Sequence, residues 1–142
     1  MWALRGTETG FAIVTHFKFQ ARPFPENGKL WAGPILVPRQ KVAEVARGII
    51  SMAEKDKKGE ISDKTAMFLY VMRKELLTFI GASQDMLVIH AFDARGEAAG
   101  REEFHWVLEM DGAVDQTRGD MTLGEVGRLQ GMYVRIPLVV PC

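Results

Sequence analysis

The chain has 142 residues, of which 47% are hydrophobic and 25% charged, a composition typical of one globular domain. Its 18 basic residues balance its 18 acidic residues, so its charge gives no reason to expect binding to nucleic acid or to an anionic membrane surface. The single cysteine, Cys142, excludes an internal disulfide. No apolar run approaches the roughly 20 residues of a membrane span, and the N-terminal residues lack the pattern of a secretory signal. We therefore expect a cytoplasmic protein.

Two strands are predicted in the first part of the chain. Residues 11–20 alternate between one face with Phe11, Ile13, Thr15, Phe17 and Phe19 and another with Ala12, Val14, His16, Lys18 and Gln20. After a loop rich in proline and glycine, residues 30–37 form a second apolar stretch. Pro34 predicts that this strand lies at an edge or contains a bulge, because proline cannot donate to a ladder.

Helical spacing begins after Pro38. Apolar residues recur at helical intervals over residues 42–53, and the charged cluster 54–58 followed by Gly59 predicts the end of this helix. Residues 65–80 combine strand-like alternation with good helix formers, and we assign a strand to 65–72. Residues 86–93 predict a further strand, bounded by polar and glycine-containing turns.

Two helical segments are predicted towards the C-terminus. Helical spacing returns at Phe104, Val107 and Leu108, and a short helix starts at Thr122, which has capping-box spacing to Glu125. The order β-β-α-β-β-α predicts a single α+β domain over residues 1–142, with an antiparallel sheet of about four strands and helices packed on one face.

The opening of the chain resembles a known family. Residues 2–6 (WALRG) and 10–15 (GFAIVT) are similar to a signature of FAD-linked oxidases of the berberine-bridge type. Residues 28–33 (GKLWAG) and the segment from Met110 through Arg118 to Gly131 are also similar to that family. This resemblance, over roughly residues 1–131, implies the ferredoxin-like substrate-binding domain of a fungal member.

The departures from the family pattern concern the flavin. Thr7, Glu8 and Thr9 occupy the family's glycine-rich turn, where the backbone approaches the cofactor closely, and Glu8 would bring a carboxylate towards phosphate. The flavin domain has no counterpart here. We therefore expect a truncated, stand-alone substrate domain without a cofactor, in which residues 1–10 are a remnant of the flavin-side motif and 132–142 a divergent tail.

Candidate site residues follow from the sheet face that the resemblance places towards the substrate. Histidine exchanges protons near neutral pH and tyrosine can hydrogen-bond a carbonyl or oxyanion, so we expect His90, His16 and Tyr70 to be catalytic. The alternative for each is structural: a surface histidine at 16, a hydrogen-bonded core histidine at 90, and packing aromatics at Tyr70 and Trp31. No metal motif is present. The expected substrate-binding residues are Trp31, Lys18, Val14, Val88, Phe92 and Met86.

These residues suggest chemistry that a pocket can perform without flavin. We expect a cofactor-independent enzyme of fungal secondary metabolism that cyclises or isomerises a hydrophobic small molecule. The alternatives are a non-catalytic binding or accessory module of a full-length oxidase, and an inactive truncated oxidase. The apolar sheet face without helices also predicts a homodimer, unless the tail 132–142 folds over it.

Overall fold

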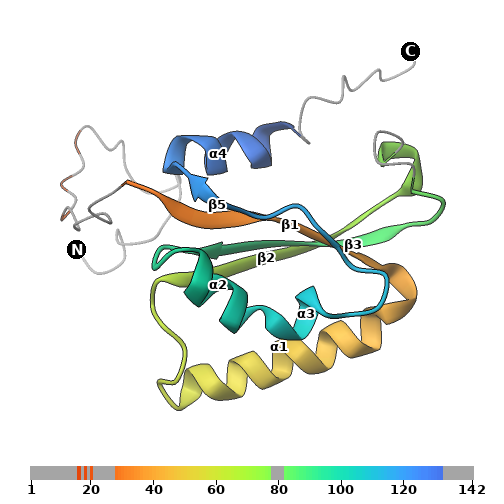
Figure 1. Cartoon of the computed structure of the whole chain (residues 1–142), viewed down its shortest axis with the longest axis horizontal. Helices are drawn as coiled ribbons and strands as arrows, with labels where there is room; N and C mark the ends of the chain where they lie inside the picture. The colour runs from red at the N-terminus through yellow and green to blue at the C-terminus, as the bar shows by residue number, and fades with distance from the viewer. Residues whose placement is uncertain (1–15, 17, 19, 21–27, 78–81, 133–142) are drawn as a thin grey trace.

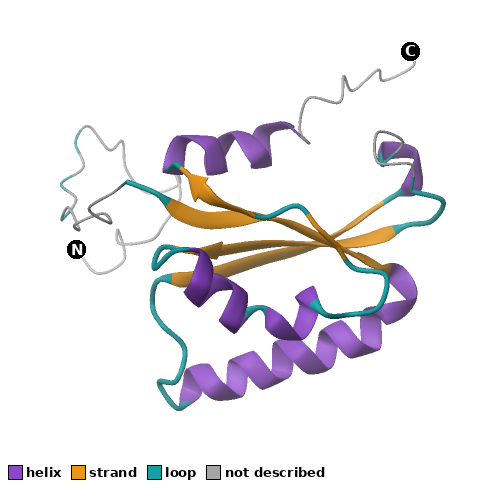
Figure 2. Cartoon of the chain, in the orientation of Figure 1, coloured by secondary structure: helices purple, strands orange, loops and turns teal. Residues whose placement is uncertain are grey.

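The computed structural model of the chain describes residues 16, 18, 20, 28–77 and 82–132, which form an antiparallel sheet between two layers of helices (Figures 1 and 2). The strands are β1 (Leu30–Pro38), β2 (Thr65–Met72), β3 (Met86–Asp93), β4 (Val114–Asp115) and β5 (Arg118–Met121). They are arranged in the order β2-β3-β1-β4, and β5 also pairs with β1. The helices are η2 (Arg39–Lys41), α1 (Val42–Lys57), η3 (Lys74–Leu76), α2 (Glu97–Glu103), α3 (His105–Leu108) and α4 (Leu123–Met132).

The predicted α+β class and antiparallel sheet are confirmed, and the strands at 30–37, 65–72 and 86–93 lie where the alternation placed them. The sheet has five strands instead of about four. The predicted strand at 11–20 lies mostly outside the described residues, and its three described members, His16, Lys18 and Gln20, are exposed and belong to no strand. None of the helices formed by the described residues is both long and apolar enough to cross a membrane.

Of the two alternatives predicted for the strand with Pro34, the edge position is wrong, because β1 is central, between β3 on one side and β4 and β5 on the other. The other alternative agrees with a bulge or irregularity in the pairing of β1 with β5. The Pro34 carbonyl accepts a hydrogen bond from the backbone N–H of Gln116 at 3.0 Å. A strand residue directs its N–H position and its carbonyl to the same neighbour, so the missing donor of Pro34 faces the short link between β4 and β5. Proline is tolerated there because the ladder is already interrupted, and the register with β5 shifts between Leu30 and Ala32.

One face of the sheet, which we call the helix face, packs against α1, α2 and α3. Trp31 packs on Phe104 there, with ring centroids 5.6 Å apart, and neither residue has exposed surface. From α1 only Val45 and Met52 are fully buried, while Val42 and Ile50 at the margins of the predicted apolar stripe are more than half exposed. The main core consists of Trp31, Ile35, Val37, Val45, Met52, Leu87, Ile89, Ala91, Phe104 and Val107.

The opposite face, which we call the cavity face, is covered only in part. The expectation that helices pack on one face of the sheet is corrected here, because α4 lies on the other side of the sheet from α1, α2 and α3 (Figure 1). At one end of this face α4 packs on Leu30, Ala32 and Met121. At the other end Leu77 and Ala82 join Leu36, Met72, Met86 and Val88 in a second cluster. The open apolar face that suggested a homodimer is therefore largely covered, with a gap between these two clusters.

Candidate functional site

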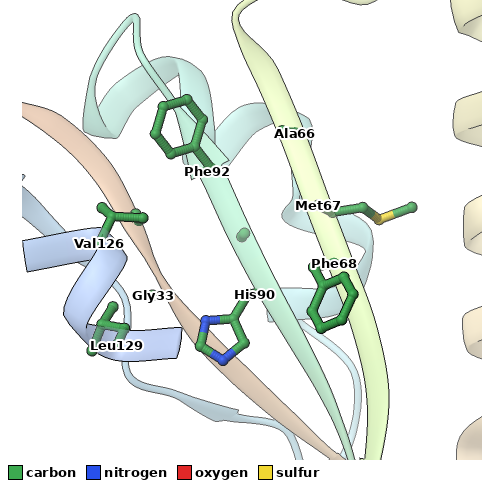
Figure 3. A pocket seen from close by; sticks show the side chains of 10 residues that line it. Gly33, Ala66, Met67, Phe68, His90, Phe92, Val126 and Leu129 are labelled. Atoms are coloured by element: carbon green, nitrogen blue, oxygen red, sulfur yellow. The ribbon is translucent and has the colours of Figure 1, made fainter. Parts of the chain in front are cut away.

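A cavity of about 270 Å³ occupies this gap between α4 and β2 (Figure 3). Its floor is formed by β1 and β3, one wall by α4, and the other by β2. This volume lies just below the range of pockets for drug-sized ligands, which begins at about 300 Å³. The cavity is lined by Ala32, Gly33, Ala66, Met67, Phe68, His90, Ala91, Phe92, Val126 and Leu129.

His90 is the one titratable side chain among these ten residues. It lies in β3 directly opposite Pro34 of β1 and Phe68 of β2, so that it stands near the middle of the sheet. It is 9% exposed, and burial lowers the pKa of its imidazole below the ordinary value of 6.5. The imidazole is therefore mainly neutral at neutral pH and can accept a proton.

Tyr70 is the partner of this histidine. Its hydroxyl oxygen lies 3.0 Å from His90 Nε2, and the tautomer of the ring decides which of the two groups donates. The two rings stack with centroids 5.7 Å apart, and the ring of Phe68 lies 5.5 Å from that of Tyr70. Tyr70 does not itself line the cavity, so it contacts the site through its hydrogen bond with His90.

The wall formed by α4 depends on its N-terminal cap. Thr122 N–H donates to Glu125 Oε2 at 2.8 Å, and Glu125 N–H donates in return to Thr122 Oγ1 at 3.4 Å. This reciprocal pair is the predicted capping box, and it satisfies two backbone donors that a helix start leaves open. Val126 and Leu129 follow one helical turn apart and face the cavity, as Figure 3 shows.

The floor depends on Gly33 in β1. Its φ is +148°, and a Cβ atom at this position would lie 2.7 Å from the carbonyl oxygen of Gln116. Glycine is therefore required where β1 passes the link between β4 and β5. The absence of a side chain also lets the backbone of β1 line the cavity directly.

The predicted site residues separate into three groups. His90 and Phe92 line the cavity, and Tyr70 is hydrogen-bonded to His90. Met86 and Val88 lie on the same face but are buried in the second cluster, and Trp31 is buried on the helix face, so none of these three lines the cavity. His16 and Lys18 are exposed outside regular structure, and Val14 lies outside the described residues.

Sequence reasoning missed eight of the ten lining residues, among them Ala66, Phe68, Val126 and Leu129. The first two shared the alternating pattern that placed Tyr70 on one face of residues 65–72, and the signal was therefore present. Val126 and Leu129 are spaced three residues apart in the predicted C-terminal helix, which indicates a common helix face without indicating the surface that this face contacts.

An ionic cluster centred on the buried Asp93 lies elsewhere in the sheet and has a structural role. Asp93 has no exposed surface, and its carboxylate accepts hydrogen bonds from Arg95 Nη2 at 2.6 Å and from Thr65 Oγ1 at 2.8 Å. Burial opposes ionisation of this carboxyl, but these donors outweigh it and hold the pKa of Asp93 below its ordinary value. The cluster joins the start of β2 to the end of β3 and does not reach the cavity.

No group of three or more His, Cys, Asp or Glu side chains in the described part of the chain is placed to hold a metal ion. Comparisons of the chain with protein-family models, with curated proteins and with solved structures find no match. The assignment of a function therefore depends on the chemistry of the cavity.

Proposed function

We propose that the chain binds a small, mainly apolar molecule between α4 and β2 and transfers a proton on it without a cofactor, with His90 as the acid–base group. The observation that supports this proposal is one buried histidine, whose pKa is lowered by burial, among ten described lining residues of which the other nine are apolar or glycine. Such a lining supplies affinity through burial, and the imidazole supplies a group that can both accept and return a proton.

The chemistry suits an isomerisation or cyclisation. His90 would take a proton from an acidic C–H or O–H of the ligand and return it to another atom, so that no redox partner is needed. A base at Nδ1, the ring nitrogen turned towards the α4 side in Figure 3, requires the tautomer in which Nε2–H donates to the Tyr70 hydroxyl oxygen. Tyr70 would then also stabilise the imidazolium that forms.

A relation to the substrate-binding domain of FAD-linked oxidases of the berberine-bridge type is part of this proposal. It rests on the opening motif of residues 2–15, which lies outside the described residues. Under this relation the ligand is a hydrophobic intermediate of secondary metabolism, and the cavity is a substrate pocket that works without flavin.

Binding without turnover is the second candidate function. It is favoured by the lining itself, because nine of the ten residues are apolar or glycine and provide no second acid–base group. A carrier or accessory module needs only such a surface.

Ligand binding is tested first with a cavity-filling variant. Ala66 is an exposed residue of the cavity wall, and Ala66→Phe should occupy the volume without removing core contacts. The control is Val71→Phe, a substitution at an exposed position on the opposite face of the same strand. We expect 2-tetralone and 2-naphthol to shift the His90 ring resonances of the wild type and the control, and not those of Ala66→Phe. Equal shifts in all three proteins would place the ligand elsewhere.

Proton transfer is tested with deuterium exchange. 2-Tetralone carries acidic hydrogens beside its carbonyl, and a general base should accelerate their exchange in D₂O by about 10²-fold or more over buffer. The variant His90→Gln should bind the ketone and lose the acceleration, as followed by mass spectrometry. Binding by the wild type without any acceleration would contradict the enzymatic proposal and support the binding module.

A further inference from the structure

β2 is an outermost strand of the sheet formed by the described residues, and its composition is unusual for that position. Its eight residues contain no charge, no proline and no glycine, and its pairing with β3 is regular throughout. Phe68 is 56% exposed on the cavity face, while Leu69 and Val71 are 39% and 55% exposed on the helix face. Monomeric proteins usually protect an edge strand with charges, proline or a bulge, and β2 has none of these.

The backbone groups that β2 directs outward can be identified. The carbonyl of Lys64 accepts from the N–H of Ala94 at 3.0 Å, so residue 64 directs its polar groups towards β3. These directions alternate along a strand, and the even-numbered residues of β2 therefore bond to β3. Met67, Leu69 and Val71 direct their N–H and C=O groups away from the sheet.

We propose that the β2 edge pairs with the β2 edge of a second copy of this chain, antiparallel, about a two-fold axis perpendicular to the sheet. This symmetry leaves the cavity faces of both copies on the same side, and it requires a strand that can lie beside itself without like charges in contact. The uncharged sequence Thr65–Met72 meets that requirement. The pairing joins the two sheets into one.

The charges that flank β2 select the register. With Phe68 opposite the partner's Phe68, Asp63 lies opposite the partner's Arg73 at both ends of the interface, an attractive pair. A register centred on Leu69 would instead oppose Lys64 with Lys74 and Asp63 with Glu75, which are pairs of like charge. We therefore assign the register centred on Phe68.

The second copy also contributes to the cavity. Phe68 belongs to the cavity wall on the β2 side, and no described strand of the same chain lies beyond it. In the assigned register the partner's Tyr70 lies opposite Ala66, on the cavity face. The partner's β2 thus lies beside the β2 wall of the cavity and places a second aromatic side chain next to Ala66.

The oligomeric state tests this interface without any ligand, so its outcome is independent of the proposed function. Sedimentation equilibrium between about 1 and 100 micromolar covers the affinities of small interfaces, and we expect a mass that doubles from 15.9 kDa. Leu69→Lys should remain at 15.9 kDa over this range. Val42→Lys, at an exposed apolar position on α1, should dimerise like the wild type. Circular dichroism confirms that each variant is folded.

Charge reversal tests the register. Asp63→Arg and Arg73→Asp each place like charges together at both ends of the interface, and each should raise the dissociation constant about tenfold. The double variant restores opposite charges and should return to the wild-type value. Additive weakening in the double variant would exclude this register.

Hydrogen exchange separates the remaining outcomes. In the dimer the amides of Met67, Leu69 and Val71 should be protected, and protection should be lost in Leu69→Lys. A monomer at every concentration would overturn the proposal, and protected amides in that monomer would assign the edge to another segment of the same chain. A dimer that survives Leu69→Lys would equally overturn it.

Discussion

His90 makes stability dependent on pH. Its pKa is lower in the folded protein than the ordinary value of 6.5, so the unfolded chain binds a proton at higher pH than the folded chain. The contribution of neutral His90 is complete above pH 6.5 and decreases as the pH falls from there towards the folded pKa. None of the described residues that line the cavity carries a charged side chain.

The variant His90→Gln should therefore lose less stability than the wild type between about pH 7 and pH 5. The midpoint of urea unfolding, measured at several pH values, reports the difference. Parallel profiles for His90→Gln and the wild type would show that burial of this imidazole is not linked to folding.

The space for a side chain at position 100 is limited by the neighbouring Trp31. A Cβ atom at this position in α2 would lie 2.2 Å from the Trp31 ring, which is fully buried and cannot move into solvent. Gly100→Ala should therefore destabilise the protein by about 1–3 kcal/mol despite the better helix propensity of alanine. Gly124→Ala in α4 meets no atom within 4 Å and should stabilise the protein by about 1 kcal/mol or less. Thermal unfolding of both variants compares the two effects, and a stable Gly100→Ala would contradict the close packing of α2 on β1.

Among the elements, α4 is the one through which helix stability should affect ligand affinity. Thr122→Ala removes the hydroxyl that caps the helix and should cost about 1 kcal/mol, whereas Thr122→Ser retains it and should cost little. Because Val126 and Leu129 form the cavity wall, ligand affinity should decrease with the cap in Thr122→Ala and be preserved in Thr122→Ser. Unchanged affinity in Thr122→Ala would indicate that the wall does not depend on the cap. Chemical denaturation and ligand titration of the same samples separate the two effects.

For the molecule as a whole, local patterns predicted the elements better than their arrangement. Alternation located β2, the bounding turns located β3, and helical spacing located α1, because each of these patterns is local in the sequence. The central position of Pro34 could not be predicted, since it depends on where β4 and β5 meet β1, far away in the sequence. The position of α4 could not be predicted for a similar reason, because two apolar residues define a helix face but not the surface that this face contacts.

The candidate site was likewise predicted only in part. His90, Tyr70 and Phe92 were predicted because the resemblance placed their face of the sheet towards a substrate and because histidine and tyrosine carry acid–base and hydrogen-bonding groups; in the structure two of them line the cavity and Tyr70 bonds to His90. Trp31 was assigned to that face too, but residues 30–38 are buried on both sides, and an apolar run of this kind does not distinguish the two faces of a sheet. The cavity itself arises because α4 covers one end of the face and Leu77 and Ala82 cover the other, an arrangement that only the tertiary structure determines.

The distribution of tryptophan has a spectroscopic consequence. Trp31 and Trp106 both lie on the helix face, where the Trp106 indole N–H donates to the sulfur of Met52 at 3.2 Å, and neither lines the cavity. Emission from these two indoles therefore reports the packing of α1, α2 and α3 against the sheet and is insensitive to events on the far side. Loosening of α4 would leave the fluorescence of Trp31 and Trp106 nearly unchanged. Within the described part of the chain, these two indoles thus follow one side of the sheet selectively.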